Sequence, residues 1–423
     1  MRDFRLNYSR RNAMLQELRV SRTEPLPASD GILLPSLCRA GMHVFSILTV
    51  VLCLLPTLAA ARVIKVGQQE SIKTIAEAAK LARDDDIVEI ESGDYVGDVT
   101  VWRQKRLTIR GIGQRPVLRA AGRSAQGKAI WVIRNGEFNI SNIEFRDATV
   151  ADGNGAGIRF ERGKLKVERC AFFANQTGIL TANFQDAELI IEDSIFGQAQ
   201  KQKKLPHLLY VGRIERLTVV RSRFHGGHYG HLLKSRARFN DIRYNFLVDG
   251  PGGRASYEAE FPNGGDVTLV GNVIGQSSLT ENLTVVAYGA EGYVWPRNRL
   301  RMVHNTLYSE GYFPAWFLRV FGNNKGLPPE VMTRNNLLVG TGIFTMTIKG
   351  QHDGNHFARE AVFTAPSIMD FTLRTSSDLR GTVTPISPDP DGLQPRFEQI
   401  RPDHVSAIGQ ISAWAPGALQ SAK

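Results

Sequence analysis

Residues 240–247 read NDIRYNFL and residues 267–274 read VTLVGNVI, so one short pattern occurs in both stretches. Each stretch alternates apolar and polar residues, turns at a residue followed by Asn, and then resumes with apolar residues. Alternation with a period of two is typical of a half-buried β-strand, and turn residues mark where such a strand ends. The pattern therefore predicts two short strands that meet at a bend.

The same pattern recurs along most of the chain, at spacings of 23 to 33 residues. Its copies begin at Leu107, Phe138, Leu165, Leu189, Leu217, Asn240, Val267, Leu300 and Val331. One copy cannot bury its apolar face alone, but stacked copies give every strand a parallel neighbour above and below. The period predicts an all-β solenoid, a parallel β-helix with three short strands per coil. A leucine-rich repeat would need denser Leu spacing, and a propeller a longer period.

Asn occupies the sixth position of the last four copies, at Asn245, Asn272, Asn305 and Asn336. Asn tolerates the left-handed backbone of a tight bend. Stacked amides can also hydrogen-bond from one coil to the next. We therefore expect a structural ladder of amides along one corner of the solenoid.

Both ends of the repeat array predict caps. Residues 71–82 carry apolar residues at helical spacing, and an amphipathic helix there would cover the open first coil. Towards the C-terminus the repeat gives way to a stretch rich in Pro, Asp and Ser. We expect the β-helix domain over residues 62–345 and an irregular C-terminal cap and tail over residues 346–423.

The N-terminal residues are expected to lie outside the folded domain. Residues 44–61 form an apolar run that contains Pro56 and ends in small residues, which is typical of a signal peptide cleaved after Ala61. We assign residues 42–61 to this signal peptide. Residues 1–41 are expected to be an unstructured extension or a mis-assigned start of translation.

Charge and cysteine content limit the partners. The chain has 52 Lys and Arg against 41 Asp and Glu, and loss of residues 1–61, with seven Arg and four acids, changes the net charge from +11 to +8. Pro56 disfavours a membrane anchor, so we expect a secreted or periplasmic protein without stable membrane insertion. We also expect a monomer. An anionic polysaccharide suits a basic exported protein better than nucleic acid does. Of three cysteines only Cys170 remains, so no disulfide is expected.

The densest polar stretch, residues 225–291, holds the candidate site residues. The catalytic candidates are Lys234, Arg236, Arg254, Tyr257 and His231, and the substrate-binding candidates are Arg238, Glu258, Glu260 and Glu291. Lys234 and Tyr257 each lie 17 residues after the start of a copy, which predicts neighbouring rungs of one outer face. Because strands repeat their facing every two residues, Lys234 should share a face with Arg236, and Glu258 with Glu260.

These residue types suit β-elimination at a uronate, which needs a cation to neutralise the carboxylate and a base to remove the C5 proton. Arg binds a carboxylate through two hydrogen bonds. Lys or Tyr can be the base where neighbouring cations lower its pKa. Lys234 is therefore the candidate base, with Tyr257 or His231 as proton donor. Arg236 or Arg254 would hold the uronate.

The same residues also fit a protein without catalysis. Lys234, Arg236 and Arg238 can form a solvated face, with Glu258 and Glu260 as salt partners. A polysaccharide-binding or cell-envelope structural protein is therefore the alternative function. Four aromatic residues are expected either to pack under the cap or to contact polymer: Tyr312, Phe313, Trp316 and Phe317.

The capping helix, the Asn-turn coils and the tail MDFTLR resemble secreted right-handed parallel β-helix proteins of the pectate-lyase-like superfamily. Within them, HLLKSRARFNDIRYNFLVDGPG at residues 231–252 is similar to a segment of chondroitinase B and related alginate lyases. That resemblance implies a polysaccharide lyase with Lys234 as base and Ser235 beside it. Those lyases place calcium-binding carboxylates just before the Lys, where this chain has His228 and His231. No cofactor is therefore expected; calcium remains an alternative that the sequence does not support.

Overall fold

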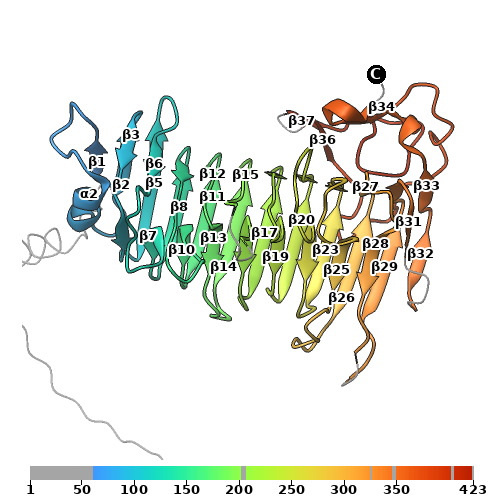
Figure 1. Ribbon diagram of the computed structural model, residues 1–423, viewed down its shortest axis with the longest axis horizontal. Coiled ribbons are helices and arrows are strands. Elements are labelled where there is room, and N and C mark those ends of the chain that lie inside the picture. The colour runs from blue at the N-terminus through green and yellow to red at the C-terminus, as the bar shows by residue number, and fades with distance from the viewer. Residues whose placement is uncertain (1–60, 202–205, 324–325, 345–348, 402–403, 422–423) are drawn as a thin grey trace, which may run out of the picture. The chain divides into compact units, whose positions relative to one another are not determined.

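Each repeat of the sequence folds into one coil of three short strands, and the coils stack along one axis (Figure 1). The computed structural model describes residues 61–201, 206–323, 326–344, 349–401 and 404–421. The expected extension over residues 1–41 and nearly all of the expected signal peptide lie outside these described residues. The stacked coils confirm the predicted parallel β-helix.

Within the described part of the chain, the β-helix has three parallel sheets, called A, B and C, with 12, 11 and 10 strands. Sheet A consists of β1 (Val63–Val66), β2 (Ile87–Glu91), β5 (Arg106–Ile112), β8 (Glu137–Ser141), β11 (Lys164–Glu168), β14 (Glu188–Glu192), β17 (Arg216–Val220), β20 (Phe239–Arg243), β23 (Asp266–Val270), β26 (Arg299–Val303), β29 (Glu330–Arg334) and β32 (Gln351–Asp353). Sheet B consists of β3 (Asp94–Val96), β6 (Val117–Arg119), β9 (Glu144–Arg146), β12 (Ala171–Phe173), β15 (Ile195–Gly197), β18 (Arg223–His225), β21 (Phe246–Val248), β24 (Val273–Gln276), β27 (Thr306–Ser309), β30 (Leu337–Val339) and β33 (His356–Ala358). Sheet C consists of β4 (Thr100–Trp102), β7 (Ala129–Ile133), β10 (Ala156–Phe160), β13 (Thr177–Thr181), β16 (Leu209–Val211), β19 (Leu233–Ser235), β22 (Ala259–Phe261), β25 (Thr284–Tyr288), β28 (Ala315–Val320) and β31 (Gly342–Ile343).

Alternate residues of each strand build the interior. In β17, Leu217 and Val219 are fully buried while the residues beside them are partly or fully exposed. At the end of the repeat, phenylalanines stack from coil to coil, with ring centroids 5.1, 4.6 and 4.7 Å apart along the series Phe145, Phe172, Phe196 and Phe224. The core is therefore a set of columns that run along the solenoid, each made by one position of the repeat.

The predicted amide ladder holds the corner between sheets A and B. Nδ2 of Asn272 donates to Oδ1 of Asn305 over 2.9 Å. Asn245 makes the same bond to Asn272, and Asn305 makes it to Asn336. Each accepting Oδ1 also takes a backbone N–H from the coil before it. All four expected members are confirmed, and Asn355 continues the ladder by one more coil.

The left-handed backbone of this bend lies one residue before the Asn. Tyr244 and His304 have φ angles of 56° and 50°, and Gly271 fills the same place with φ 65°. The predicted backbone role of Asn is therefore wrong, because the residue before it carries the unfavourable conformation. The Asn residues act through their buried amides alone.

Helix α2 (Ile75–Leu81) covers the first coil, as predicted, although it is shorter than residues 71–82. The Thr74 hydroxyl caps its N-terminus by accepting a hydrogen bond from the backbone N–H of Glu77. Its buried residues join the main core: Ile75, Ala78 and Ala79. The open apolar end of the solenoid is thereby covered.

The C-terminal segment packs on the outer face of sheet B. It contains η1 (Glu360–Val362), β34 (Phe363–Ala365), η2 (Pro366–Ile368), β35 (Asp370–Leu373), β36 (Phe397–Arg401) and β37 (His404–Ala407). Phe363 and Phe371 pack with Phe246 and Tyr308, which point outward from β21 and β27. The coils themselves continue to β33, past the expected boundary at residue 345. The segment also reaches sheet A, where Leu393 packs with Val270 and Val303.

We predict that Asn272→Ala lowers the free energy of unfolding by about 2–4 kcal/mol. The substitution removes an amide that accepts from Asn245 and donates to Asn305 and to the Ile242 carbonyl, so buried partners lose their hydrogen bonds. Guanidinium unfolding followed by circular dichroism measures the loss. The exposed control Asn154→Ala should change stability by less than about 0.5 kcal/mol. Equal stability of both variants would contradict a structural role of the ladder.

Candidate functional site on sheet C

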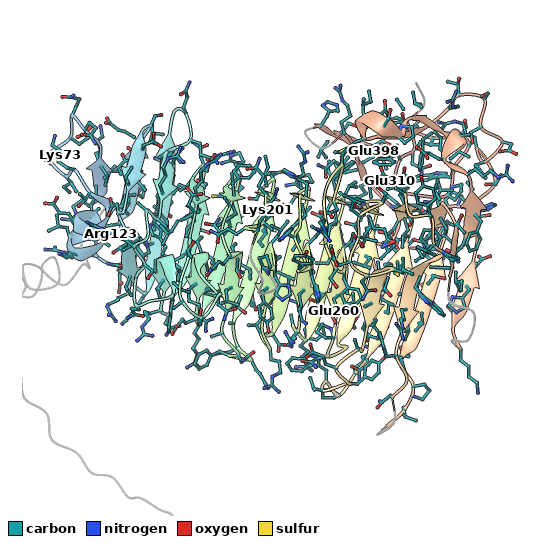
Figure 2. All side chains as sticks on the ribbon, viewed as in Figure 1. Lys73, Arg123, Lys201, Glu260, Glu310 and Glu398 are labelled. Carbon is teal, nitrogen blue, oxygen red and sulfur yellow. The ribbon has the colours of Figure 1, made fainter. Side chains whose placement is uncertain are left out.

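The outer face of sheet C gathers most of the predicted site residues. Strand pairing aligns Tyr210 of β16 with Lys234 of β19, and Lys234 with Glu260 of β22. The residue before each of them lies in the main core, so these three side chains point outward. In Figure 2, Glu260 lies on the lower side of the β-helix, whereas Glu398 of the cap lies on the upper side.

A second outward row lies three residues earlier, at His207, His231 and Tyr257. Backbone bonds that join His231 O to Leu208 N and Tyr257 O to Leu232 N fix this alignment. Two consecutive core residues, such as Leu232 and Leu233, separate the two rows. Lys234 and Tyr257 therefore lie on neighbouring rungs as predicted, but in different rows.

The cations of this face hold a carboxylate. Lys234 Nζ lies 3.0 Å from Oε1 of Glu291 and 2.9 Å from Oε2 of Glu260. Nη2 of Arg236 donates to both oxygens of Glu291 at 2.7 Å, and its Nη1 donates to the Tyr210 hydroxyl at 2.8 Å. Lys234 and Arg236 thus share a face, as predicted. Together they form a receptor for a carboxylate, which Glu291 occupies.

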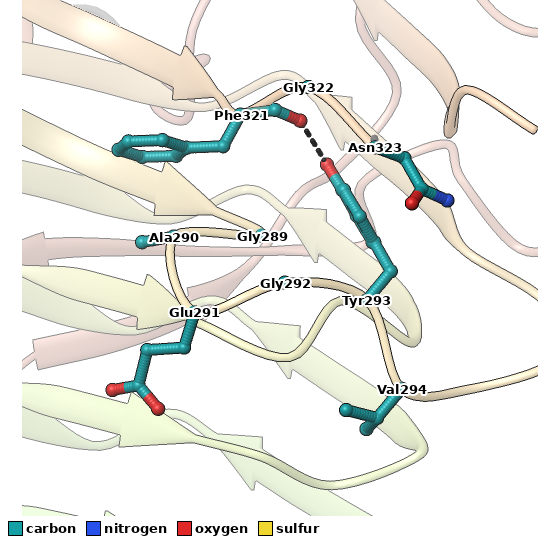
Figure 3. A pocket seen from close by; sticks show the side chains of 9 residues that line it. All are labelled: Gly289, Ala290, Glu291, Gly292, Tyr293, Val294, Phe321, Gly322 and Asn323. Atoms are coloured by element: carbon teal, nitrogen blue, oxygen red, sulfur yellow. Dashed lines mark hydrogen bonds between the residues drawn. The ribbon is translucent and has the colours of Figure 1, made fainter. Parts of the chain in front are cut away.

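Glu291 reaches this receptor from the loop that follows β25 (Figure 3). Gly289 and Gly292 adopt φ of 82° and 88°, conformations open to glycine, and so turn the loop back toward earlier coils. Trp295 Nε1 donates to the Arg236 carbonyl at 3.2 Å and fastens the loop there. Beside it lies a cavity of about 520 Å³, lined by residues 289–294 and 321–323. Glu291 itself is 43% exposed, so solvent reaches the receptor.

His231 belongs to the second row and lies beside Glu260 of the cluster. Burial lowers its pKa and outweighs the opposing influence of Glu260, whose Oε2 lies 3.0 Å from Nδ1. The imidazole is therefore neutral at neutral pH. Its nearest acceptor, Glu260, favours the proton on Nδ1, which places the lone pair on Nε2. The Tyr257 ring packs edge-on against it, with centroids 4.8 Å apart.

The carboxylates of the cluster stay ionised. Burial opposes ionisation of Glu260, but His231 and Lys234 hold its pKa below the ordinary value. For Glu291, Arg236 and Lys234 likewise outweigh burial and lower the pKa. The cluster is therefore an alternating network of two carboxylates and two cations with one neutral imidazole beside it.

Two arginines predicted for the site have their partners elsewhere. Arg254 donates to Glu281 over 2.8 Å and lies over the Tyr229 ring. Arg238 is exposed and lies 3.4 Å from Glu215. Their ion-pair partners among the described residues are thus outside the Lys234 cluster. The loop between sheets B and C carries Arg254 away from the outer rows.

Glu258 does not share a face with Glu260, because the chain bends between them. It is fully buried at the position that Leu208 and Leu232 hold in the two preceding coils. Burial, together with Asp249, raises its pKa well above the ordinary value. Neither of its oxygens has a side-chain hydrogen-bond partner within the described part of the chain. A substrate on the surface cannot reach it, which corrects its expected role in binding.

Ser235, which the lyase resemblance places beside the base, also points inward. It is fully buried, and its hydroxyl bonds to the side chain of Asn240. Sequence reasoning missed His207 and Tyr210, which flank the cluster from the preceding coil. His207 Nδ1 accepts the backbone N–H of His231 at 3.0 Å. The only signal for them is that the outward rows lie three residues apart along the chain, which the repeat pattern did not show.

No metal centre is evident in the described residues, where no group of three or more His, Cys, Asp or Glu side chains is placed to hold an ion. The carboxylates of the cluster are engaged by cations instead. A separate search of the described helices finds none that is long and apolar enough to cross a membrane.

Comparison with known proteins supports the fold. No protein-family model and no curated protein sequence matches the chain. Among solved structures it is similar to the crystal structure of pectate lyase Pel9A, with a TM-score of 0.58 and 12% identity over 85% of this chain and 97% of that one. A protein of Geobacillus virus E2, ORF18, gives a TM-score of 0.39 and 10% identity over 65% of this chain and 53% of that one. The first likeness shows the right-handed parallel β-helix that the resemblance implied.

We predict that Glu258→Leu raises the free energy of unfolding at neutral pH by about 1–4 kcal/mol, because leucine fills this position in the two preceding coils. In the wild type, stability should fall as pH rises above the ordinary Glu pKa of 4.5. The unfolded chain then loses the Glu258 proton more readily than the folded chain does. Denaturant unfolding at several pH values measures both effects. If the stability gained by Glu258→Leu did not increase with pH, the inference that Glu258 is protonated in the folded protein would be wrong.

Proposed function

We propose that the protein is an exported β-helix protein that binds an anionic, uronate-containing polysaccharide on the outer face of sheet C and cleaves it by β-elimination. One observation carries the proposal: Lys234 and Arg236 hold a carboxylate directly beside a neutral histidine. That arrangement offers both chemical tasks that elimination requires. The Glu291 carboxylate marks where the uronate carboxylate would bind.

The contacts change the role expected of Lys234. Because Glu260 and Glu291 both contact its Nζ, Lys234 serves as a cation and the base comes from elsewhere. Lys234 and Arg236 would neutralise the uronate carboxylate and so acidify the C5 proton beside it. His231 is the base, because it is neutral and Glu260 orients its ring.

The elimination balances as follows. Nε2 of His231 takes the C5 proton, and the electrons of that bond form the C4–C5 double bond. The bond from C4 to the glycosidic oxygen breaks, and the leaving oxygen needs a proton. Tyr257, packed on His231, would donate it. The products are a new reducing end and an unsaturated uronate.

Other features agree with this proposal without deciding it. The solved structure of similar fold is a pectate lyase, and the apolar run at residues 44–61 suits an exported protein. The net charge of +8 that remains without residues 1–61 favours an anionic partner. A protein that binds the polymer without cleaving it is the alternative, since Glu260 and Glu291 satisfy both cations.

We predict that His231→Gln lowers kcat/KM for the cleaved polymer by about 10²–10⁴-fold. Purified protein is tested on polygalacturonate, alginate and glycosaminoglycans, and ultraviolet absorbance follows the unsaturated product. In the wild type, kcat/KM should fall on acidification as His231 becomes protonated. The midpoint of this fall should lie below the ordinary histidine pKa of 6.5, because burial lowers the pKa of His231.

The matched control is His228→Gln, since His228 lies outside the cluster and should leave the rate unchanged. Loss of cleavage in Lys234→Ala with unchanged polymer binding would return the role of base to Lys234. Polymer binding with no product from any tested polymer would favour the non-catalytic alternative.

We also predict that Glu291→Gln binds acidic oligosaccharides more tightly, by about three- to tenfold, because the internal carboxylate no longer competes for Lys234 and Arg236. Titration calorimetry measures the change. Glu281→Gln is the control, since Glu281 pairs with Arg254 outside the cluster. Weaker binding by Glu291→Gln would instead show that Glu291 contacts the substrate, as the sequence suggested.

A further inference from the structure

The outward rows of sheet C continue beyond the cation cluster toward the last coils. Strand pairing places Trp316 of β28 in the row of His231, and Arg319 in the row of Lys234. Each lies three rungs further along the solenoid, through β22 and β25 to β28. Since neighbouring strands lie about 4.8 Å apart, the separation along the axis is about 14 Å.

Arg319 differs from the arginine of the cluster in having no acidic partner. Within the described residues, no carboxylate lies at ion-pair distance from it. Its guanidinium lies 4.6 Å from the ring centre of Phe321 and 5.9 Å from that of Trp316. The side chain is exposed. Its hydrogen-bond donors are therefore held in place by aromatic stacking and remain available to an anion.

Three aromatic residues that precede Arg319 in the chain are also exposed. Tyr312 and Phe313, in the loop before β28, are 96% and 70% exposed, and Trp316 is 36% exposed. Only Phe317 is buried in the core among these four, so the expected packing under the cap does not hold for the others. The cap packs on sheets B and A instead. The exposed Trp316 ring lies next to Arg319 and is open to a ligand.

We propose that Trp316 and Arg319 form a second subsite, which binds another acidic sugar unit of the same polysaccharide. This inference rests on the proposed function. The apolar face of a sugar ring would stack on Trp316, and its carboxylate would accept hydrogen bonds from Arg319. Because the rows run along the solenoid, a long chain lying parallel to the axis meets Lys234 and Arg319 together. A short oligomer reaches only one of them.

Chain-length dependence tests this subsite. Binding of polygalacturonate and alginate, each as polymer and as trimer, is measured by calorimetry in the His231→Gln background, where the polymer stays intact. Trp316→Ala and Arg319→Ala should each weaken polymer binding by about tenfold and leave trimer binding unchanged. Both side chains are surface-exposed, and thermal melts confirm that the variants are folded.

Arg162→Ala is the matched control, because Arg162 also lies over an aromatic ring, that of Phe184, but is paired with Asp186. It should change neither affinity. Unchanged polymer binding in both subsite variants, or an equal loss for polymer and trimer, would overturn the second subsite and leave the proposed function standing. If the parent protein binds neither polymer, both proposals fail for these acidic polysaccharides.

Discussion

The alignment of equivalent positions in successive coils, along the axis of the solenoid, is the constraint on which the rest of the structure depends. A coil has no interior of its own, so each inward side chain must pack on the residue one repeat above and below it. The amides of Asn245, Asn272 and Asn305 meet this requirement through hydrogen bonds. Once these columns are fixed, the outward rows are fixed too, and Lys234 must lie beside Glu260.

The chemistry of the site follows from this register. His231 and Lys234 are three residues apart and lie in adjacent outward rows, so both contact the same oxygen of Glu260. Glu291, which comes from a later loop, then completes a charge network that no single coil contains. Sheet C places the cations and the imidazole, whereas the glycine-flanked loop supplies the Glu291 carboxylate.

The solenoid, its amide ladder and its capping helix could be predicted because each arises from local pattern repeated along the chain. The face shared by Lys234 and Arg236 was also predictable from strand alternation. The burial of Glu258 was not, because it depends on a bend that puts two consecutive residues into the core. The partners of Arg254 and the approach of Glu291 depend on loop paths, which repeat spacing does not encode.

Two of the interior columns are held by different forces. Stacked phenylalanines run from Phe145 to Phe224, and the amide ladder begins at Asn245, in the next coil. Hydrophobic packing weakens on cooling, whereas a buried amide ladder does not rely on it. Cooling should therefore weaken the contribution of the aromatic column to stability more than that of the amide ladder.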